Sequence, residues 1–268
     1  MAGRYLYKYV EFDKELNVLK LITESKIKFS EPAKFNDPFD CNPYYIGSND
    51  PKKLRPDLFA RLDSYGKSPA ERLIATQQAI NRANASFKDG RFQEATMAAV
   101  GILSLSRTPW HVLMWSHYAK HHTGFVVEFQ EPDVIPPRQN GLHQRWLVTF
   151  EVEYTVDRPV VERWKRTELT SIDKIFMSKS IEWAYEEEER VVNYIGGPGI
   201  FEYESSLLKS VIAGCKISDK HFALLSAAVK DANKHRKNKI SLFRAELDER
   251  KYQLNIPKFN RPRSPAIA

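Results

Sequence analysis

Hydrophobic and polar residues alternate with a period of two along several short stretches of the chain, which is the pattern of β-strands. The first stretch, RYLYKYVEF, alternates aromatic and polar residues, and KIKFS follows after a polar interval. In RWLVTFEVEYTV the alternation places Val148, Phe150, Val152 and Tyr154 on one face. Further strands are predicted in GILSLS, GFVVEF, EERVVNYI, SLLKSVIAG, ISLFRAELD and KYQLNI.

Helices are predicted between these strands. Leu16, Leu19 and Ile22 have helical spacing in DKELNVLKLITESK, and residues 51–99 are predicted to be helical over a longer range. Ser68-Pro69-Ala70-Glu71 has the residue types of a helix start, with serine at the N-cap, proline at N1 and glutamate at N3. Helices are also expected in PWHVLMWSHYAKHH, which Gly124 ends, in LTSIDKIFMSK and in SDKHFALLSAAVKDANKH.

The order of these elements indicates the fold class. Strands and helices are interspersed without a regular βαβ alternation, which favours an α+β domain over a doubly wound sheet. No long linker or internal repeat divides the chain, so we expect a single domain over residues 1–256, with a mixed, bent β-sheet and a helical insertion at about 51–99. Residues 257–268, PKFNRPRSPAIA, are expected to form a basic, flexible tail.

Composition narrows the class of protein. The 268 residues are 42% hydrophobic and 28% charged, as in an ordinary folded protein, and the formal net charge is +7. A basic surface of this kind suits nucleic acid or a nucleotide as partner, although it can also be merely basic. The two cysteines, the absence of a membrane-length apolar run and the absence of a signal-peptide core at the N-terminus predict a cytoplasmic protein without a membrane partner.

Two further stretches have some features of ligand sites. The GGPG stretch at 196–199 lacks the Lys-Ser/Thr of a phosphate-binding loop, so we interpret it as a turn. His117 and His121 are four apart on a predicted helix, a spacing that can bind zinc, but residue 118 is tyrosine and no third ligand is evident. We therefore predict no metal site there, and expect the imidazoles to hold a helix end or a polar ligand.

Two aromatic-rich stretches have a structural and a functional interpretation. In FNDPFD, residues 35–40, Asn36 or Asp37 can satisfy its own backbone in an Asx turn. Alternatively, the loop packs aromatics against a planar ligand while its polar side chains bond the ligand's hydroxyls. In LMWSHYA, the nearby helix positions of Trp115, Tyr118 and His122 are typical of a buried core, although tyrosine and tryptophan can also line a pocket.

The acidic run Glu186–Glu189 leads directly into a β-type apolar stretch. If EERVVNYI is a strand, Glu186, Glu188 and Arg190 share one face, because side chains alternate along a strand. Arg190 can then hold a carboxylate ionised and oriented, which suits stabilisation of a cationic transition state or recognition of ribose hydroxyls. The alternative is a solvated strand edge with weak surface ion pairs.

Several motifs occur together in this chain, and together they resemble a known family. LYKY, IKFSEPAKFNDPFD, LSLS, LMWSHYAKHHTGFVVEF and KSIEWAYEEEER follow one another between Tyr5 and Ile256. In this order they resemble a bacterial family catalogued as a domain of unknown function. That family is in turn loosely similar to the ADP-ribosyltransferases, including bacterial toxins that modify nucleic acid.

The resemblance implies roles for particular residues. ADP-ribosyltransferases carry a polar residue on a first strand, a serine or aromatic on a middle strand and a catalytic glutamate on a later strand. The matching positions here are Lys8 and Tyr9, then Ser104 and Ser106, and then Glu186 and Glu188. Lys8 departs from the arginine or histidine that is usual at the first position.

The resemblance also implies a function: an NAD-dependent ADP-ribosyltransferase, of toxin or phage-defence type, with NAD as co-substrate. RNA is the preferred acceptor, DNA or protein are alternatives, and an antitoxin protein is a further expected partner. The residues implied as catalytic are Glu188, Glu186 and Arg190, and those implied in cofactor binding are Lys8, Tyr9, Asn36, Asp37, Ser104, Ser106, Trp115, Tyr118 and His122.

Two other functions stay open at this stage. One is a non-catalytic module that binds a nucleotide or RNA through the same residues. The other is a nuclease or other hydrolase in which Glu186, Glu188 and Asp37 hold a metal through oxygen ligands.

Overall fold

The computed structural model describes residues 4–46, 68–132, 142–162 and 174–261. The chain divides into two compact units. The first comprises residues 1–30, 101–152 and 182–268, and the second comprises residues 31–100 and 153–181. The segment 51–99, predicted as a helical insertion, falls within the second unit.

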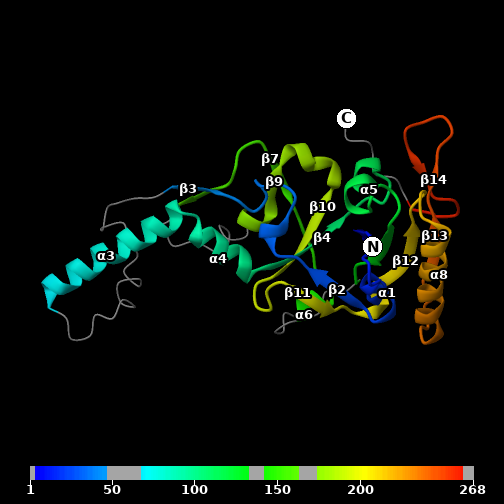
Figure 1. Ribbon diagram of the computed structural model, residues 1–268, viewed down its shortest axis with the longest axis horizontal. Coiled ribbons are helices and arrows are strands. Elements are labelled where there is room, and N and C mark those ends of the chain that lie inside the picture. The colour runs from blue at the N-terminus through cyan, green and yellow to red at the C-terminus, as the bar shows by residue number, and fades with distance from the viewer. Residues whose placement is uncertain (1–3, 47–67, 133–141, 163–173, 262–268) are drawn as a thin grey trace. The chain divides into compact units, whose positions relative to one another are not determined.

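The first unit is built on a mixed seven-stranded sheet (Figure 1). Neighbouring strands of this sheet are antiparallel, except that β12 and β13, at one edge, are parallel. Across the sheet the strands are β13 (Ser241–Arg244), β12 (Leu208–Ala213), β5 (Phe125–Gln130), β1 (Tyr5–Val10), β4 (Gly101–Ser106), β10 (Glu188–Asn193) and β6 (Phe150–Glu151). An α+β fold with a mixed sheet, as predicted, is confirmed.

Smaller elements complete the first unit. Two short strand pairs are β2 (Lys26–Phe29) with β11 (Gly199–Glu202), and β14 (Glu246–Leu247) with β15 (Leu254–Asn255). The helices are α1 (Lys20–Thr23), α5 (Val112–Tyr118), α6 (Leu142–Arg145) and α8 (Asp219–Lys234), with 3₁₀ turns at Asn17–Leu19, Ile181–Glu186 and Ser205–Leu207.

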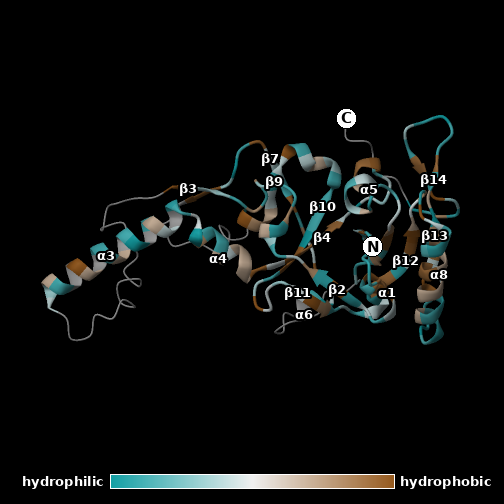
Figure 2. Ribbon diagram, viewed as in Figure 1, coloured by the Kyte–Doolittle hydropathy of each residue, from teal (hydrophilic) through white to brown (hydrophobic). Residues whose placement is uncertain are grey.

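Side chains on both faces of the large sheet are buried. Adjacent residues of one strand enter different hydrophobic clusters: Leu6 belongs to one and Tyr7 to the other. Helix α8 covers the first face with Leu225, while α5 covers the second with Trp115. Figure 2 shows hydrophobic residues along β12, as expected for a strand that is covered on both sides.

The second unit contains two parallel strand pairs and two helices. Strand β3 (Tyr44–Ile46) pairs with β8 (Val160–Glu162), and β7 (Glu153–Thr155) pairs with β9 (Ser178–Ser180). The helices are α3 (Pro69–Lys88) and α4 (Arg91–Ala99), with a 3₁₀ turn at Pro32–Lys34 and a helical stretch at 174–177. The predicted start of α3 is confirmed, because Ser68 and Glu71 form a reciprocal capping box.

Three local predictions are wrong. The helix predicted to run to Gly124 ends at Tyr118, and Lys120, His121 and His122 all have positive φ angles. Gly124 has a different role: a Cβ there would lie 2.1 Å from the Val10 carbonyl oxygen, so the close approach of the two backbones requires glycine.

The strand predicted in RWLVTFEVEYTV is divided, since β6 belongs to the large sheet of the first unit and β7 pairs with β9 in the second. The long helix predicted in DKELNVLKLITESK is reduced to a 3₁₀ turn and α1, because Leu16 adopts a left-handed conformation.

The tail predicted from residue 257 is ordered at its start. Phe259 is buried and packs edge-on against Tyr7, Trp110 and Phe243. Arg261 forms an ion pair with the fully buried Glu128 of β5, with 2.7 Å between Nε and Oε1. The rest of the predicted tail, residues 262–268, and the predicted helical residues 51–67 lie outside the described residues.

Candidate functional site

Three segments that are distant in sequence form adjacent strands at the candidate site (Figure 1). Strand β4 lies between β1 and β10, with Tyr7 opposite Ser106 and with Glu188 also opposite Ser106. Arg190 lies opposite Ser104. Because residues that are paired across a sheet share a face, the serines of β4 and the Glu188–Arg190 pair lie on one face.

Glu188 and Arg190 form a buried bidentate ion pair. Arg190 Nε donates to Glu188 Oε1 at 2.8 Å, and Arg190 Nη2 donates to Oε2 at 3.0 Å. Both side chains are buried, and Arg190 is among the largest fully buried residues. Charge-assisted bidentate bonds of this kind fix the carboxylate plane. The prediction that these two residues share a strand face is therefore confirmed.

Glu186 lies near this pair but is not on strand β10, where the sequence had predicted it. It ends the 3₁₀ turn Ile181–Glu186, and Glu187, with φ 45°, separates it from β10. Tyr118 donates a hydrogen bond to Glu186 Oε1 at 2.6 Å, and Ser106 Oγ donates to the Glu186 carbonyl at 2.7 Å. Helix α5 thus holds the carboxylate of Glu186, while strand β4 holds its backbone.

The other two carboxylates of the acidic run make different contacts. Glu187 Oε2 lies 3.9 Å from Arg107 Nε, and Glu189 Oε1 lies 2.9 Å from Arg4 Nη1. Glu189 is completely buried rather than solvated. The interpretation of the whole run as a solvated strand edge is therefore wrong for the three buried carboxylates, Glu186, Glu188 and Glu189.

Lys8 lies where the sheet divides. Strand β1 pairs with β4 at Tyr7–Ser106, whereas Ser30, just beyond β2, exchanges backbone hydrogen bonds with Ile102 of β4. Between these two positions the Lys8 ammonium donates to the Ser104 carbonyl at 3.0 Å. Burial lowers the pKa of Lys8 to about 8, and the nearby Glu188 and Glu186 carboxylates oppose that shift.

Aromatic rings at α5 and in the 3₁₀ turn that Glu186 ends contact one another. His111 stacks on Tyr185 with ring centroids 4.9 Å apart, and Trp183 lies 6.0 Å from Tyr185 and 6.3 Å from His117. The sequence interpretation missed Trp183 and Tyr185 as candidate site residues. Their two-residue spacing directly before Glu186, in WAYE, was the available signal.

Three predicted cofactor contacts have core positions. Tyr9 is buried and its hydroxyl donates to the Thr108 carbonyl at 2.8 Å. Trp115 is completely buried, and its indole nitrogen donates to the Pro109 carbonyl at 2.8 Å. The ring of His122 stacks on Trp115, and burial lowers the His122 pKa, helped by the charges of neighbouring basic groups. For Trp115 and His122, these positions match the buried core that was the alternative interpretation of the LMWSHYA stretch.

Asn36 and Asp37 belong to the second unit. Asp37 Oδ1 accepts a hydrogen bond from the Phe39 backbone nitrogen at 2.9 Å, as in the Asx turn that the sequence allowed. Asp37 Oδ2 is buried and has no hydrogen-bond partner in the described part of the chain. In the same loop, buried Asp40 forms an ion pair with Lys179 at 3.7 Å. A role for Asn36 and Asp37 in cofactor binding stays a prediction from the sequence.

No group of three or more metal-binding side chains was found among the described residues. His117 and His121 do not share a helix face, since α5 ends at Tyr118 and His121 has φ 55°. The described residues also include no helix long and apolar enough to cross a bilayer.

The comparison with protein families gave a match to part of the chain. Residues 114–191 match a family described as "Protein of unknown function (DUF2971)". This stretch resembles a family without an assigned function. It includes Tyr118, Glu186, Glu188 and Arg190, so the match covers the carboxylates and their partners. The comparisons with curated proteins and with solved structures gave no match.

Proposed function

We propose that the first unit binds NAD and transfers its ADP-ribose to an acceptor, with nucleic acid, and RNA in particular, as the preferred acceptor. One observation carries the proposal: Lys8, Ser104 and Glu188 come from three adjacent strands, β1, β4 and β10. These are the first, middle and later strand positions that the resemblance to ADP-ribosyltransferases implies. A protein with this activity would suit a toxin or a phage-defence effector.

The buried carboxylates fit the charge that develops in this reaction. When the bond between ribose and nicotinamide breaks, its electron pair leaves with nicotinamide and positive charge remains on the ribose. The bond to the acceptor then forms at the same ribose carbon. Carboxylates that are already fixed in position stabilise such a charge without reorganisation.

The two carboxylates differ in how they could act. Glu188 accepts hydrogen bonds from Arg190 on both oxygens, so its orientation is fixed and its charge is partly compensated. The hydrogen bond from Tyr118 to Glu186 is from a neutral donor. We therefore propose that both carboxylates face the ribose, with Glu188 held by Arg190 and Glu186 held by Tyr118.

Lys8 and the aromatic residues supply the remaining contacts in this proposal. The Lys8 ammonium can pair with the diphosphate of NAD as a point charge, in place of arginine. Trp183 and Tyr185, beside Glu186, offer rings that can stack on nicotinamide or adenine.

A second candidate function is favoured by the same ion pair. Because both Glu188 oxygens are engaged by Arg190, the site can hold a nucleotide without catalysing its cleavage. A binding module and a transferase are distinguished by incubating the protein with labelled NAD and RNA, DNA or cell lysate. The transferase releases nicotinamide and labels an acceptor, whereas the binding module retains intact NAD.

A further inference from the structure

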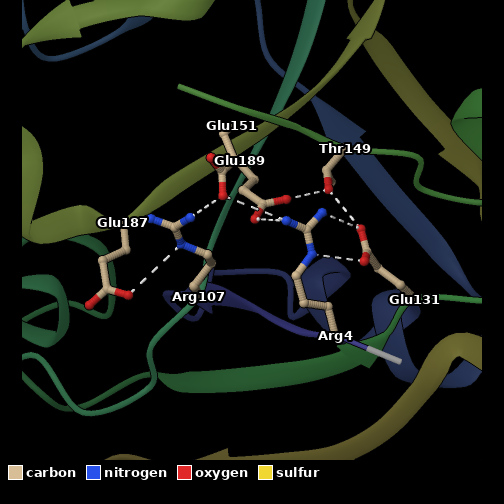
Figure 3. A network of polar contacts seen from close by, with 7 residues as sticks. All are labelled: Arg4, Arg107, Glu131, Thr149, Glu151, Glu187 and Glu189. Carbon is tan, nitrogen blue, oxygen red and sulfur yellow. Dashed lines mark hydrogen bonds and ion pairs between the residues drawn. The ribbon is translucent and has the colours of Figure 1, made fainter. Parts of the chain in front are cut away.

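Figure 3 shows a second charged network, which includes Glu189 of β10. Because side chains alternate along a strand, Glu189 is on the other face of β10 from the Glu188–Arg190 pair. It gathers four carboxylates, two guanidinium groups and one hydroxyl from β6, β10 and the residues next to β1, β4, β5, β6 and β10. Its members are Arg4, Arg107, Glu131, Thr149, Glu151, Glu187 and Glu189. The carboxylates outnumber the cations by four to two, and Glu189 is completely buried among them.

The contacts of Thr149 require a proton that an all-ionised network does not contain. Thr149 Oγ lies 2.5 Å from Glu189 Oε2 and 3.0 Å from Glu131 Oε1. A hydroxyl has a single proton, so it can donate to one of these carboxyls only. The other short contact is a hydrogen bond only if that carboxyl is protonated and donates to the threonine oxygen.

Glu189 is the better holder of this proton. Arg4 donates to both oxygens of Glu131 at 2.9 Å, which favours the ionised form of Glu131. A negative charge on Glu189 would be less well compensated. Arg4 Nη1 lies 2.9 Å from Glu189 Oε1, but the two atoms do not form a well-aligned hydrogen bond. Burial also raises the pKa of Glu189, and the charge of Glu131 adds to the shift, while Thr149 and the arginines oppose it.

We infer that Glu189 is held protonated, donates its proton to Thr149 Oγ, and through this bond positions the start of β10. The Thr149 hydroxyl proton is then donated to Glu131 Oε1, so both short contacts of the threonine oxygen are hydrogen bonds. Glu189 pairs with Glu151 across β10 and β6, and it directly follows Glu188. The neutral carboxyl thus joins β6 to the first residues of β10, on the side opposite the candidate site. This inference does not depend on which ligand that site binds.

A protonated Glu189 makes the stability of the folded protein depend on pH. The pKa of Glu189 is raised in the folded state, so the folded protein binds more protons than the unfolded chain between the ordinary carboxyl pKa, about 4.3, and the raised value. Stability from this group is complete below that range and is lost as pH rises through the raised pKa. The charged groups that face Glu189 are Arg4, Arg107, Glu131, Glu151 and Glu187.

Infrared difference spectroscopy of the whole protein tests the proton directly. Glu189→Gln keeps the shape of the neutral carboxyl, and Glu187→Gln, two residues earlier in the same network, is the matched control. The parent should show the carbonyl band of a protonated carboxyl at neutral pH. That band should be missing from Glu189→Gln, present in Glu187→Gln, and lost from the parent as pH rises. A parent without the band, or a band that survives Glu189→Gln, overturns the inference.

A second variant keeps the test independent of how Glu189→Gln folds. Thr149→Val removes the acceptor of the Glu189 proton while keeping the side-chain shape, so the carboxyl band should move in frequency. An unchanged band in Thr149→Val contradicts the proposed bond. Urea unfolding at several pH values gives a further readout: the parent should lose stability as pH rises above the ordinary carboxyl range, and Glu189→Gln should lose this dependence. Equal pH dependence in both proteins argues against a titrating Glu189.

Discussion

Replacing Arg261 by methionine is expected to destabilise the first unit by about 3 kcal/mol, because the Glu128 carboxylate would stay buried without its guanidinium partner. Glu128 lies on β5, an interior strand of the large sheet, and is fully buried. Arg261 donates to it from Nε at 2.7 Å and from Nη2 at 3.4 Å, and the guanidinium lies 3.9 Å from the Tyr5 ring centroid. The contact thus connects the end of the described chain to an interior strand of the sheet.

The magnitude follows from the contacts that remain. Removing one partner of a buried ion pair costs about 3–5 kcal/mol. The lower end of that range applies here, since Tyr7 and Ser210 still donate hydroxyl hydrogen bonds to Glu128, at 3.2 and 2.8 Å. The Arg261 side chain is also 28% exposed, so its charge is partly screened. At about 2–4 °C per kcal/mol for a chain of this size, the melting temperature should fall by about 6–12 °C.

Urea and thermal unfolding measure this loss, with Arg145→Met as the control. Arg145 forms a 3.4 Å ion pair with Glu204 that is largely exposed, so its removal should cost less than about 1 kcal/mol. Combining Arg261→Met with Glu128→Gln should recover part of the loss, because the unpaired charge is then removed. If Arg261→Met costs no more than Arg145→Met, the reasoning about the buried pair is refuted.

Three further predictions concern NAD, the core and nucleic acid. Burial lowers the pKa of Lys8 to about 8, so the parent should lose NAD affinity above that pH, where the ammonium loses its proton. Lys8→Arg should keep its NAD affinity over the same pH range, and equal losses in NAD titrations of both proteins would contradict this. Tyr203→Phe should lower the free energy of unfolding by about 1–3 kcal/mol, because the tyrosine hydroxyl donates to the Leu21 carbonyl at 2.6 Å. An unchanged midpoint of urea unfolding would contradict this prediction. RNA binding should weaken steeply as salt rises, because counterions are released on binding, and salt-independent binding would point to a protein acceptor.

The strands of the large sheet could be predicted because each is short and has a local pattern. GILSLS, GFVVEF and SLLKSVIAG contain β4, β5 and β12, and SDKHFALLSAAVKDANKH contains α8. Glu188 and Arg190 could be placed on one strand face for the same reason, since alternation along a strand is a local rule.

The remaining features depend on contacts between distant residues. Glu128 and Arg261 are 133 positions apart, and nothing local to either residue indicates their pairing. The early end of α5 depends on three successive residues with positive φ, Lys120 to His122, none of which is glycine. The helix position of Trp115 is equally consistent with a core residue and with a residue that lines a pocket. Its complete burial, which the sequence does not show, favours the core.

NAD turnover by glutamine variants of the acidic run tests the central claim most directly. Glu186→Gln and Glu188→Gln keep size and hydrogen-bonding capacity but remove one charge each, and Glu187→Gln is the control. Purified variants of matched thermal stability should show turnover reduced about a hundred- to a thousand-fold for the first two, which corresponds to about 2.7–4 kcal/mol, and little changed for the control. If all three variants turn over NAD as the parent does, or if the parent releases no nicotinamide with any acceptor, the proposed transferase mechanism is contradicted.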